Sequence, residues 1–338
     1  MMRRFLTVPG FYLMGIALVV LAPLWLPITL VVDLVAAPRR LPRTRLILFA
    51  VWWTWLEIIG LTVAGWFLVT GQRRKTGPHF ALQRWWANGL VVGLRLTCRL
   101  TLETRHIDVL TPGPVIVLPR HCSLADALLS AWFVTDTGLR PHYVLKRELL
   151  ADPCLDIVGN RLPNHFLDRG AVDSGPELEA IREIARGVEG PQSCAVIFPE
   201  GTRANPAKRA RGLARLVERN PGRAAKLAAL RHLNPPRPAG TLAVLEGAPN
   251  ADIVIMAHAG FEGLDTFAGI LKVIPGTAPI LLDCVRIPRS EVPQGEDART
   301  EWLDDQWLAL DARVDVLLAE RDALVAAAEG RPREKAAT

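Results

Sequence analysis

A histidine and an aspartate lie five residues apart in a stretch whose residue types could carry out acid–base chemistry. Residues 118–126 read Leu-Pro-Arg-His-Cys-Ser-Leu-Ala-Asp, with His121 at the end of a short apolar run and Asp126 at the start of an apolar, helix-like segment. The pattern His-x4-Asp has low specificity, because it occurs by chance in about one of three chains with this many histidines. Ser123 and Asp126 also have the spacing of a capping box, in which the acid folds back over the helix start. The two interpretations are compatible, since such an aspartate points toward His121.

These two side chains suit acid–base chemistry such as the transfer of an acyl group, for example from a thioester, to an alcohol. An alcohol is a poor nucleophile at neutral pH, so a base with a pKa of about 7 that takes its proton accelerates the reaction. We expect His121 to be the base and Asp126 to fix its tautomer and stabilise the imidazolium. The leaving thiolate needs no strong acid. Cys122 leaves a covalent acyl-enzyme open, although successive side chains of an extended segment point to opposite faces. Retained activity in Cys122→Ser would exclude that alternative.

The second motif, Phe-Pro-Glu-Gly-Thr-Arg at residues 198–203, directly follows an apolar run. A given tetrapeptide such as Glu-Gly-Thr-Arg is expected by chance only about twice in a thousand chains of this length, so this motif is far more specific than the first. It predicts a turn at the end of a strand, where α/β sheets collect ligands. Gly201 permits close backbone approach, and Arg203 offers a planar fork to a phosphate. A surface turn with a Glu200–Arg203 ion pair is the alternative.

Both motifs sit in a sequence that alternates between strands and helices. We expect an α/β fold with a largely parallel central sheet flanked by helices, because short β-rich runs alternate with helical segments. The expected strands are 115–118, 143–145, 194–198 and 253–256, and the helical segments include 124–133 and 177–188. Residues 76–105 are predicted to form one or two amphipathic helices, and residues 298–329 one long helix that packs on the main domain.

The first 75 residues predict a membrane-associated hairpin that precedes the sheet. Residues 5–32 carry no charge and residues 46–72 carry only Glu57, and each stretch exceeds the roughly 20 residues that cross a bilayer as a helix. Basic residues flank every end, so two full crossings would place one basic set on the wrong side. We therefore expect a hairpin that dips into one leaflet, bent at Pro23 and Pro27, with Glu57 reaching water or a partner. A labelled cysteine near position 42 that proved periplasmic would contradict this topology.

The composition of the chain indicates the kind of partner it binds and the cellular compartment it occupies. The chain has 338 residues, a formal charge of +6 and five scattered cysteines without a Cys-x-x-Cys pair, and its mean hydropathy is +0.21. The cysteine pattern predicts a reduced compartment and no metal site. The positive charge suits a phosphate-bearing partner.

Nine of the basic residues lie at 203–231, against the single acid Glu218. We expect this basic insert to lie on anionic lipid headgroups or to receive the acyl carrier, with a solvated helix as the alternative. Charge reversal at Arg211, Arg215 and Arg219 tests the lipid version by vesicle binding.

Taken together, the two motifs resemble those of the glycerolipid acyltransferase family, whose best-known members are the 1-acylglycerol-3-phosphate acyltransferases. The resemblance covers about residues 90–267 and includes further blocks. One block begins with Lys-Arg-Glu-Leu at 146–149, continues through Asp152, Pro153 and Gly159, and ends with Phe-Leu-Asp-Arg at 166–169. Another, at 233–240, contains the Pro-Arg-x-x-Gly element of a long-insert subgroup that is similar to reticulum lysophosphatidate and lysocardiolipin acyltransferases. Arg120 stands where the family usually has Asn, and residues 255–257 lack the usual proline, so the acceptor stays open.

The resemblance implies an acyltransferase domain at residues 76–330, followed by a tail at 331–338. It implies His121 and Asp126 as catalytic residues and a substrate phosphate near Lys146, Arg203 and Arg237. Residues with a substrate-binding or structural role would be Glu200, Gly201, Thr202 and Arg169.

The implied reaction moves a fatty acyl group from acyl-CoA or acyl carrier protein, used as co-substrate without a cofactor, to a lysophospholipid, giving phosphatidic acid from 1-acylglycerol-3-phosphate. The expected location is the inner membrane, with the catalytic domain on the cytoplasmic side and no nucleic acid as partner. Two alternatives remain open: a remodelling acyltransferase for another lysophospholipid, and a non-catalytic membrane adaptor whose basic segment binds acidic partners.

Overall fold

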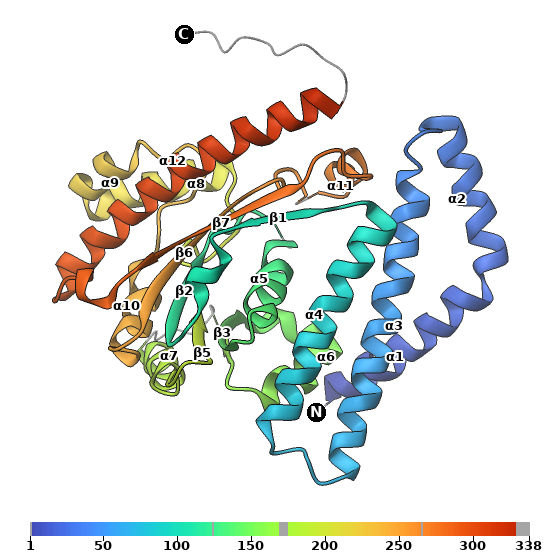
Figure 1. Cartoon of the computed structure of the whole chain (residues 1–338), viewed down its shortest axis with the longest axis horizontal. Helices are drawn as coiled ribbons and strands as arrows, with labels where there is room; N and C mark the ends of the chain where they lie inside the picture. The colour runs from blue at the N-terminus through green and yellow to red at the C-terminus, as the bar shows by residue number, and fades with distance from the viewer. Residues whose placement is uncertain (1, 124, 169–174, 265, 329–338) are drawn as a thin grey trace.

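A seven-stranded sheet runs through the computed structural model of this chain, which describes residues 2–123, 125–168, 175–264 and 266–328 (Figure 1). The strands lie in the order β1 (Leu102–Arg105), β7 (Ile280–Ile287), β6 (Asp252–Ala259), β2 (Val115–Pro119), β5 (Ser193–Val196), β3 (Arg140–Lys146) and β4 (His165–Leu167). All neighbouring strands pair in parallel except β6 and β7, which are antiparallel. The predicted largely parallel sheet is therefore confirmed.

Three strands differ from the sequence-based expectation. Residues 102–105 form the strand β1 at the sheet edge, whereas we expected residues 76–105 to be helical throughout. The helix α4 (Thr76–Cys98) ends earlier, because Arg99 adopts the left-handed conformation typical of a helix end (φ 54°). Strands β4 and β7 were not predicted. Strand β1 has only four residues, none of them fully buried, so its sequence lacks the apolar pattern by which a strand is recognised.

Helices cover both faces of the sheet. On one face lie α7 (Gly175–Arg186), α10 (Pro238–Gly247) and α12 (Glu296–Ala328), and on the other lie α5 (Ala125–Asp136), the end of α4 and α11 (Phe267–Val273). Along β2, Ile116 and Leu118 enter the first core, whereas Val115 and Val117 enter the second. Because both faces are buried, this central strand reads as a continuous apolar run. Short helical turns complete the domain: η1 (Ile107–Leu110), η2 (Arg147–Ala151), α6 (Pro153–Ile157), η3 (Gly159–Arg161) and η4 (Arg289–Glu291).

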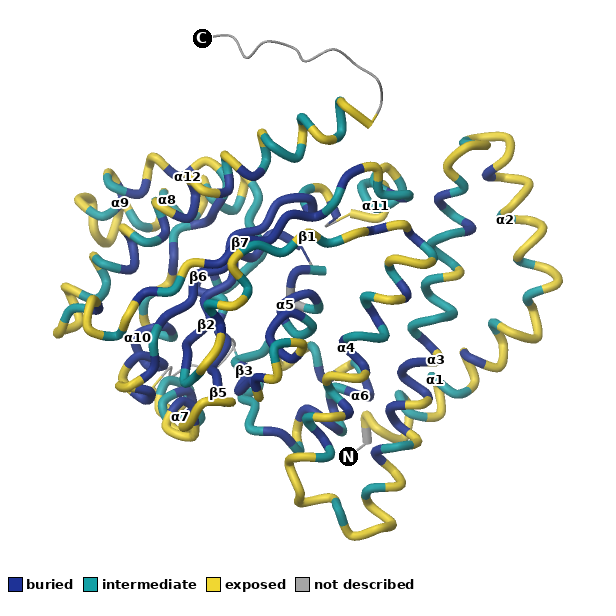
Figure 2. The backbone as a smooth tube through the Cα atoms, in the orientation of Figure 1, coloured by how far each residue is buried: buried dark blue, intermediate teal, exposed yellow. Residues whose placement is uncertain are grey.

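The N-terminal residues form a helical arm beside α4. The arm comprises α1 (Met2–Val20), α2 (Ala22–Ala36) and α3 (Pro42–Val69), and α3 packs along α4 (Figure 1). The first apolar stretch bends between α1 and α2, with Pro23 in the first turn of α2, as predicted. Two helices of the arm, Arg3–Val20 and Pro42–Val69, are long and apolar enough to cross a membrane. Most residues of α1 and α2 are exposed (Figure 2), and many of them are large and apolar.

Basic residues at two points of the arm bind the α/β domain. At the start of α1, Arg4 makes a bidentate ion pair with the buried Asp156 of α6, at 2.9 and 3.0 Å. At the turn between α2 and α3, Arg40 donates to the carbonyl of Ile274 at 3.0 Å, and Arg45 in the first turn of α3 donates to that of Thr97 at 2.9 Å. The start of the arm and its α2–α3 turn therefore rest on the same domain.

The basic insert divides into two parts. One part, α9 (Pro221–Leu227) and the loop after it, pairs with acids of α12: Arg223 with Asp304, Lys226 with Asp305, and Arg231 with Asp315. The other part, α8 (Pro206–Arg219), exposes Arg211, Arg215 and Arg219, which have no carboxylate partner among the described residues. The exposed Arg211, Arg215 and Arg219 of α8 are therefore available to an external partner. The predicted tail at 331–338 lies outside the described residues.

Candidate active site

His121 lies in the loop that joins β2 to α5, at the carboxyl end of the central strands. The amide of Arg120 donates to the carbonyl of Met256 at 3.1 Å, which extends the β2–β6 pairing by one residue before the chain leaves the sheet. The carboxyl ends of parallel strands share one edge of a sheet, so the loop after β5 reaches the same place. The two sequence motifs meet there.

The structure brings His121 and Asp126 into contact. The Nδ1 atom of His121 lies 2.9 Å from Oδ1 of Asp126. Asp126 also completes a capping box: the Ser123 amide donates to its Oδ2 at 2.7 Å, and its own amide donates to the Ser123 hydroxyl at 3.3 Å. One aspartate thus starts α5 and holds the imidazole, and both interpretations of the motif are found together. Because Nδ1 donates to the carboxylate, Nε2 is left as the acceptor nitrogen.

Asp126 remains ionised although it is almost fully buried. Burial opposes its ionisation, but hydrogen bonds from His121 and from backbone amides hold its pKa below the usual value. A carboxylate in this position stabilises an imidazolium that forms when His121 takes a proton. The geometry therefore suits His121 as a general base.

Glu200 links the two motifs through the backbone of His121. Its Oε1 accepts the His121 amide at 2.8 Å, and its Oε2 accepts the Asn234 amide at 2.8 Å. The Ala204 amide in turn donates to the His121 carbonyl at 2.7 Å. Glu200 is 1% exposed, and burial raises its pKa to about 8. The alternative of a surface turn with a Glu200–Arg203 ion pair is wrong, because the buried carboxyl group accepts backbone amides from two loops instead.

A cavity of about 400 Å³ opens in front of His121. Its lining includes the three basic side chains predicted to hold a phosphate, Lys146, Arg203 and Arg237, which come from β3, the loop after β5 and the start of α10. Among the described residues, Arg203 and Arg237 form no ion pair. The structure thus gathers the predicted base and three cationic groups around one space, although they are spread over residues 121–237 of the chain.

The remaining predicted site residues have different places. Gly201 lines the cavity in the left-handed conformation (φ 65°), which an L side chain rarely adopts, so the glycine is required by the turn. The carbonyl of Thr202 accepts from the Asn234 side chain at 3.2 Å. Arg169 lies outside the described residues.

Cys122 faces away from this cavity and belongs to the core beneath α5. Burial raises the pKa of its thiol well above the ordinary value, so the thiol stays protonated. Cys122, Asp126 and His258 place ligand atoms within 4.8 Å of one another. A metal would compete there with the hydrogen bonds that both Asp126 oxygens already accept, and it would need a thiolate, so these donors suit a metal poorly.

Two residues behind the His121–Asp126 pair, His258 and Glu262, were not predicted as site residues from the sequence. His258 is fully buried on β6, with Nε2 3.2 Å from the Arg120 carbonyl and 3.8 Å from Oδ2 of Asp126. Burial and the positive charge of Arg120 lower its pKa to about 4, so it is neutral at pH 7. Arg120 itself is buried and is not among the residues that line the cavity. It therefore does not contact an acceptor there.

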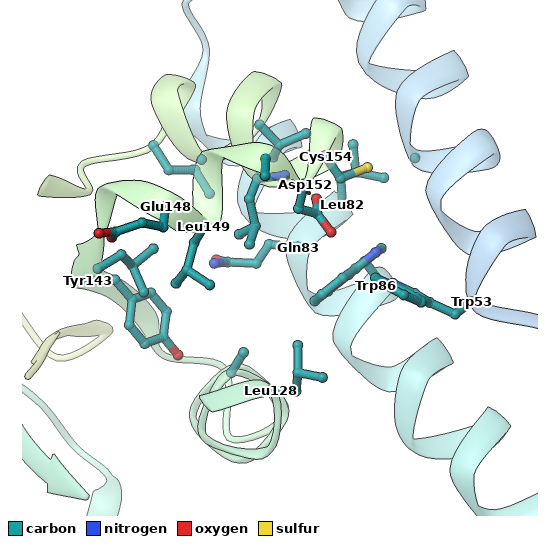
Figure 3. Close-up of a pocket in the computed structure, with 18 residues that line it drawn as sticks. Trp53, Leu82, Gln83, Trp86, Leu128, Tyr143, Glu148, Leu149, Asp152 and Cys154 are labelled. Atoms are coloured by element: carbon teal, nitrogen blue, oxygen red, sulfur yellow. Dashed lines mark hydrogen bonds between the residues drawn. The ribbon is translucent and has the colours of Figure 1, made fainter. Parts of the chain in front are cut away.

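A second cavity of about 360 Å³ lies between α3, α4, α5 and the η2–α6 segment (Figure 3). Its lining is mostly apolar and includes Trp86 and Leu128, with Gln83 and Asp152 as polar members. Leu145 and Leu149 line both cavities. The two spaces are therefore neighbours that share a wall.

A family model and a solved structure are similar to parts of this chain. Residues 102–230 match the family model described as Acyltransferase, a segment that contains both motifs. No curated protein sequence matches the chain. Among solved structures, the chain is similar to the crystal structure of the 1-acyl-sn-glycerophosphate acyltransferase PlsC from Thermotoga maritima, with a TM-score of 0.42 and 14% identity over 74% of this chain and 93% of that one.

Proposed function

We propose, because residues 102–230 match the family model described as Acyltransferase, that this protein moves a fatty acyl group from a thioester to the free hydroxyl of a lysophospholipid. The acceptor we assign is 1-acylglycerol-3-phosphate, and the product is phosphatidic acid. One observation carries the proposal: a carboxylate-bound histidine faces a cavity lined by three basic side chains.

The chemical step needs only a base and an orienting acid. Nε2 of His121 takes the proton of the acceptor hydroxyl while its oxygen attacks the thioester carbonyl. The C–S bond then breaks, and the leaving thiolate recovers the proton from the imidazolium. Asp126 stabilises that imidazolium through Nδ1. The products are an ester and a thiol. The proton that leaves the hydroxyl ends on the thiol, so the reaction needs no cofactor.

The basic side chains of the cavity would hold the acceptor by its phosphate. Lys146, Arg203 and Arg237 offer charge-assisted hydrogen bonds, which fix the position of the hydroxyl relative to His121. Neutral lysolipids lack this anchor. A lysophospholipid with a phosphodiester would keep part of it, which makes a remodelling acyltransferase the alternative that an acceptor panel must separate.

The apolar cavity is a suitable place for the acyl chain of the donor. It adjoins the charged cavity through Leu145 and Leu149, so a chain lying in it could present its thioester near His121. Burying a methylene group gains about 0.8 kcal/mol, which makes a hydrocarbon chain the natural occupant. Acyl-CoA or acyl carrier protein would supply this chain.

The helical arm would keep the enzyme at the inner membrane, on its cytoplasmic side. The contacts of Arg4 with Asp156 and of Arg40 and Arg45 with domain carbonyls hold the start of the arm and its α2–α3 turn against one domain. This arrangement favours an arm that lies in one leaflet, because two full crossings would place the α2–α3 turn on the opposite side of the membrane from the domain.

The test is thiol release from acyl-CoA with a panel of lysophospholipid acceptors. His121→Ala should reduce the rate at least about a hundredfold with every acceptor, because the base is lost. His232→Ala is the matched control, since His232 is also bound to a carboxylate, Asp315, but lies outside the cavity lining. Full activity of the His121 variant would refute the mechanism. Equal rates with phosphate-bearing and neutral acceptors would refute the assigned acceptor.

A further inference from the structure

Arg120 is a buried cation directly behind the proposed catalytic pair. It is 2% exposed, and its Nη1 donates to the His258 carbonyl and to Oε1 of Glu262, each at 2.6 Å. Glu262 also accepts the Gly260 amide through Oε2 at 2.6 Å. Burial opposes the ionisation of Glu262, but Arg120 holds its pKa below the usual range, so the buried guanidinium is paired with a carboxylate whose side chain is 35% exposed.

The same residue is braced to β6 through its backbone. The Arg120 amide donates to the Met256 carbonyl at 3.1 Å, and the Arg120 carbonyl lies 3.2 Å from Nε2 of His258. Side chain and main chain of Arg120 thus both bind the end of β6. Because His121 is the next residue, this brace fixes where the catalytic loop leaves the sheet.

The ion pair also contributes to the electric field at His121. In front of His121, the charged groups of the cavity are Lys146, Asp168, Glu177, Arg203 and Arg237. Asp126 contacts its ring, Glu200 accepts its amide, and Cys122 and the neutral His258 lie behind. Arg120 lies on the buried side beyond Asp126, with the partly exposed Glu262 as its partner. Water does not reach the Arg120 guanidinium as it reaches the cavity, so removal of the charge on Arg120 or on its partner should be felt at the imidazole.

We propose that Arg120 and Glu262 are positioning residues that act through the His121–Asp126 pair: they fix the catalytic loop and balance the field in which His121 gains its proton. This inference rests on the acyl transfer proposed above for its kinetic readout, but its physical content concerns the protonation of His121. Neither residue touches the substrate in this assignment.

The experiment compares Arg120→Gln, Glu262→Gln and the double variant with the wild type. Arg120→Gln leaves Glu262 unpaired, which stabilises the imidazolium, so the acid limb of the kcat/KM profile should move to higher pH by about half a unit or more. Glu262→Gln leaves Arg120 unpaired and should move the limb by a similar amount to lower pH. The double variant removes both charges and should return the limb close to its wild-type position.

A second readout needs no substrate. Diethyl pyrocarbonate modifies neutral imidazole, and the pH dependence of His121 modification, followed by peptide mass mapping, should show the same opposite displacements. If the wild type transferred no acyl group but these displacements appeared, the proposed function would fail and this inference would stand. If acyl transfer were found but neither readout moved, the inference would fail alone.

A matched pair controls for stability. Arg223 and Asp304 form another ion pair, between α9 and α12, at 2.6 Å. Arg223→Gln and Asp304→Asn should lower the melting temperature, as the Arg120 and Glu262 variants do, without moving either pH profile. Displacement of both single variants in the same direction, or loss of rate at every pH without displacement, would overturn the proposal.

Discussion

Two neighbouring cavities share a wall at Leu145 and Leu149 but differ in what lines them. The cavity in front of His121 is lined by Lys146, Arg203 and Arg237, whereas the other is lined chiefly by apolar side chains of α3, α4, α5 and η2–α6. Under the proposed function this difference corresponds to a division of labour, in which one space would orient an anionic acceptor by charge and the other would bind a hydrocarbon chain by burial. Each kind of specificity can then be changed separately.

The largest predicted effect concerns the back of the charged cavity and its response to acid. Burial and Arg120 lower the pKa of His258 from 6.5 to about 4, so between these values the unfolded chain binds a proton that the native protein does not. Above pH 6.5 the protonation of His258 costs the native protein nothing. As the pH falls from 6.5 toward 4, it lowers the free energy of unfolding by about 3 kcal/mol. His258→Gln should flatten this slope, measured by urea unfolding in detergent at several pH values. A slope equal to that of the wild type would contradict it, and His165→Gln serves as a control on a partly exposed histidine.

The next effect tests the acceptor side. Arg203→Ala removes charge-assisted hydrogen bonds of about 1.5–3 kcal/mol, so kcat/KM for a phosphate-bearing acceptor should fall about 10- to 100-fold. The apparent affinity for the acyl donor should change little. Arg211→Ala, on the exposed face of α8, is the matched control. If Arg203→Ala weakened neutral and phosphate-bearing acceptors alike, the charged cavity would not be a phosphate site.

The smallest effect tests the donor side. Ala131 lines the apolar cavity, and Ala131→Trp should displace roughly two methylene groups of a long acyl chain, which costs about 1.6 kcal/mol. Use of a palmitoyl donor should fall about tenfold relative to an octanoyl donor, as measured by thiol release. An unchanged ratio of the two donors would place the acyl chain elsewhere.

The sequence predicts the chemistry of the site better than its surroundings. The four central strands and the pairing of His121 with Asp126 follow from local patterns, because apolar runs and a capping box are short-range signals. Glu200 is recognisable within a specific motif, but its bonds to the amides of His121 and Asn234 depend on contacts across the fold. His258 gave no signal, since nothing near it in the chain reveals that β6 pairs beside β2.

The position of Arg120 also depends on contacts between segments far apart in the chain, which the local sequence does not reveal. As a departure from the motif of the resembling family, it left the acceptor in doubt. The structure places it against Glu262, behind the catalytic pair and away from the cavity lining. A sequence motif gives the residue type at a position but not which side of the loop that residue occupies.

The most direct test of the division of labour is a double-mutant cycle on substrate specificity. We would measure kcat/KM for palmitoyl and octanoyl donors with phosphate-bearing and neutral acceptors, in the wild type, Arg203→Ala, Ala131→Trp and the double variant. The account predicts that Arg203→Ala changes only the acceptor preference, that Ala131→Trp changes only the donor preference, and that the two effects add within about 0.5 kcal/mol. A change of donor preference in the Arg203 variant, or of acceptor preference in the Ala131 variant, would contradict it.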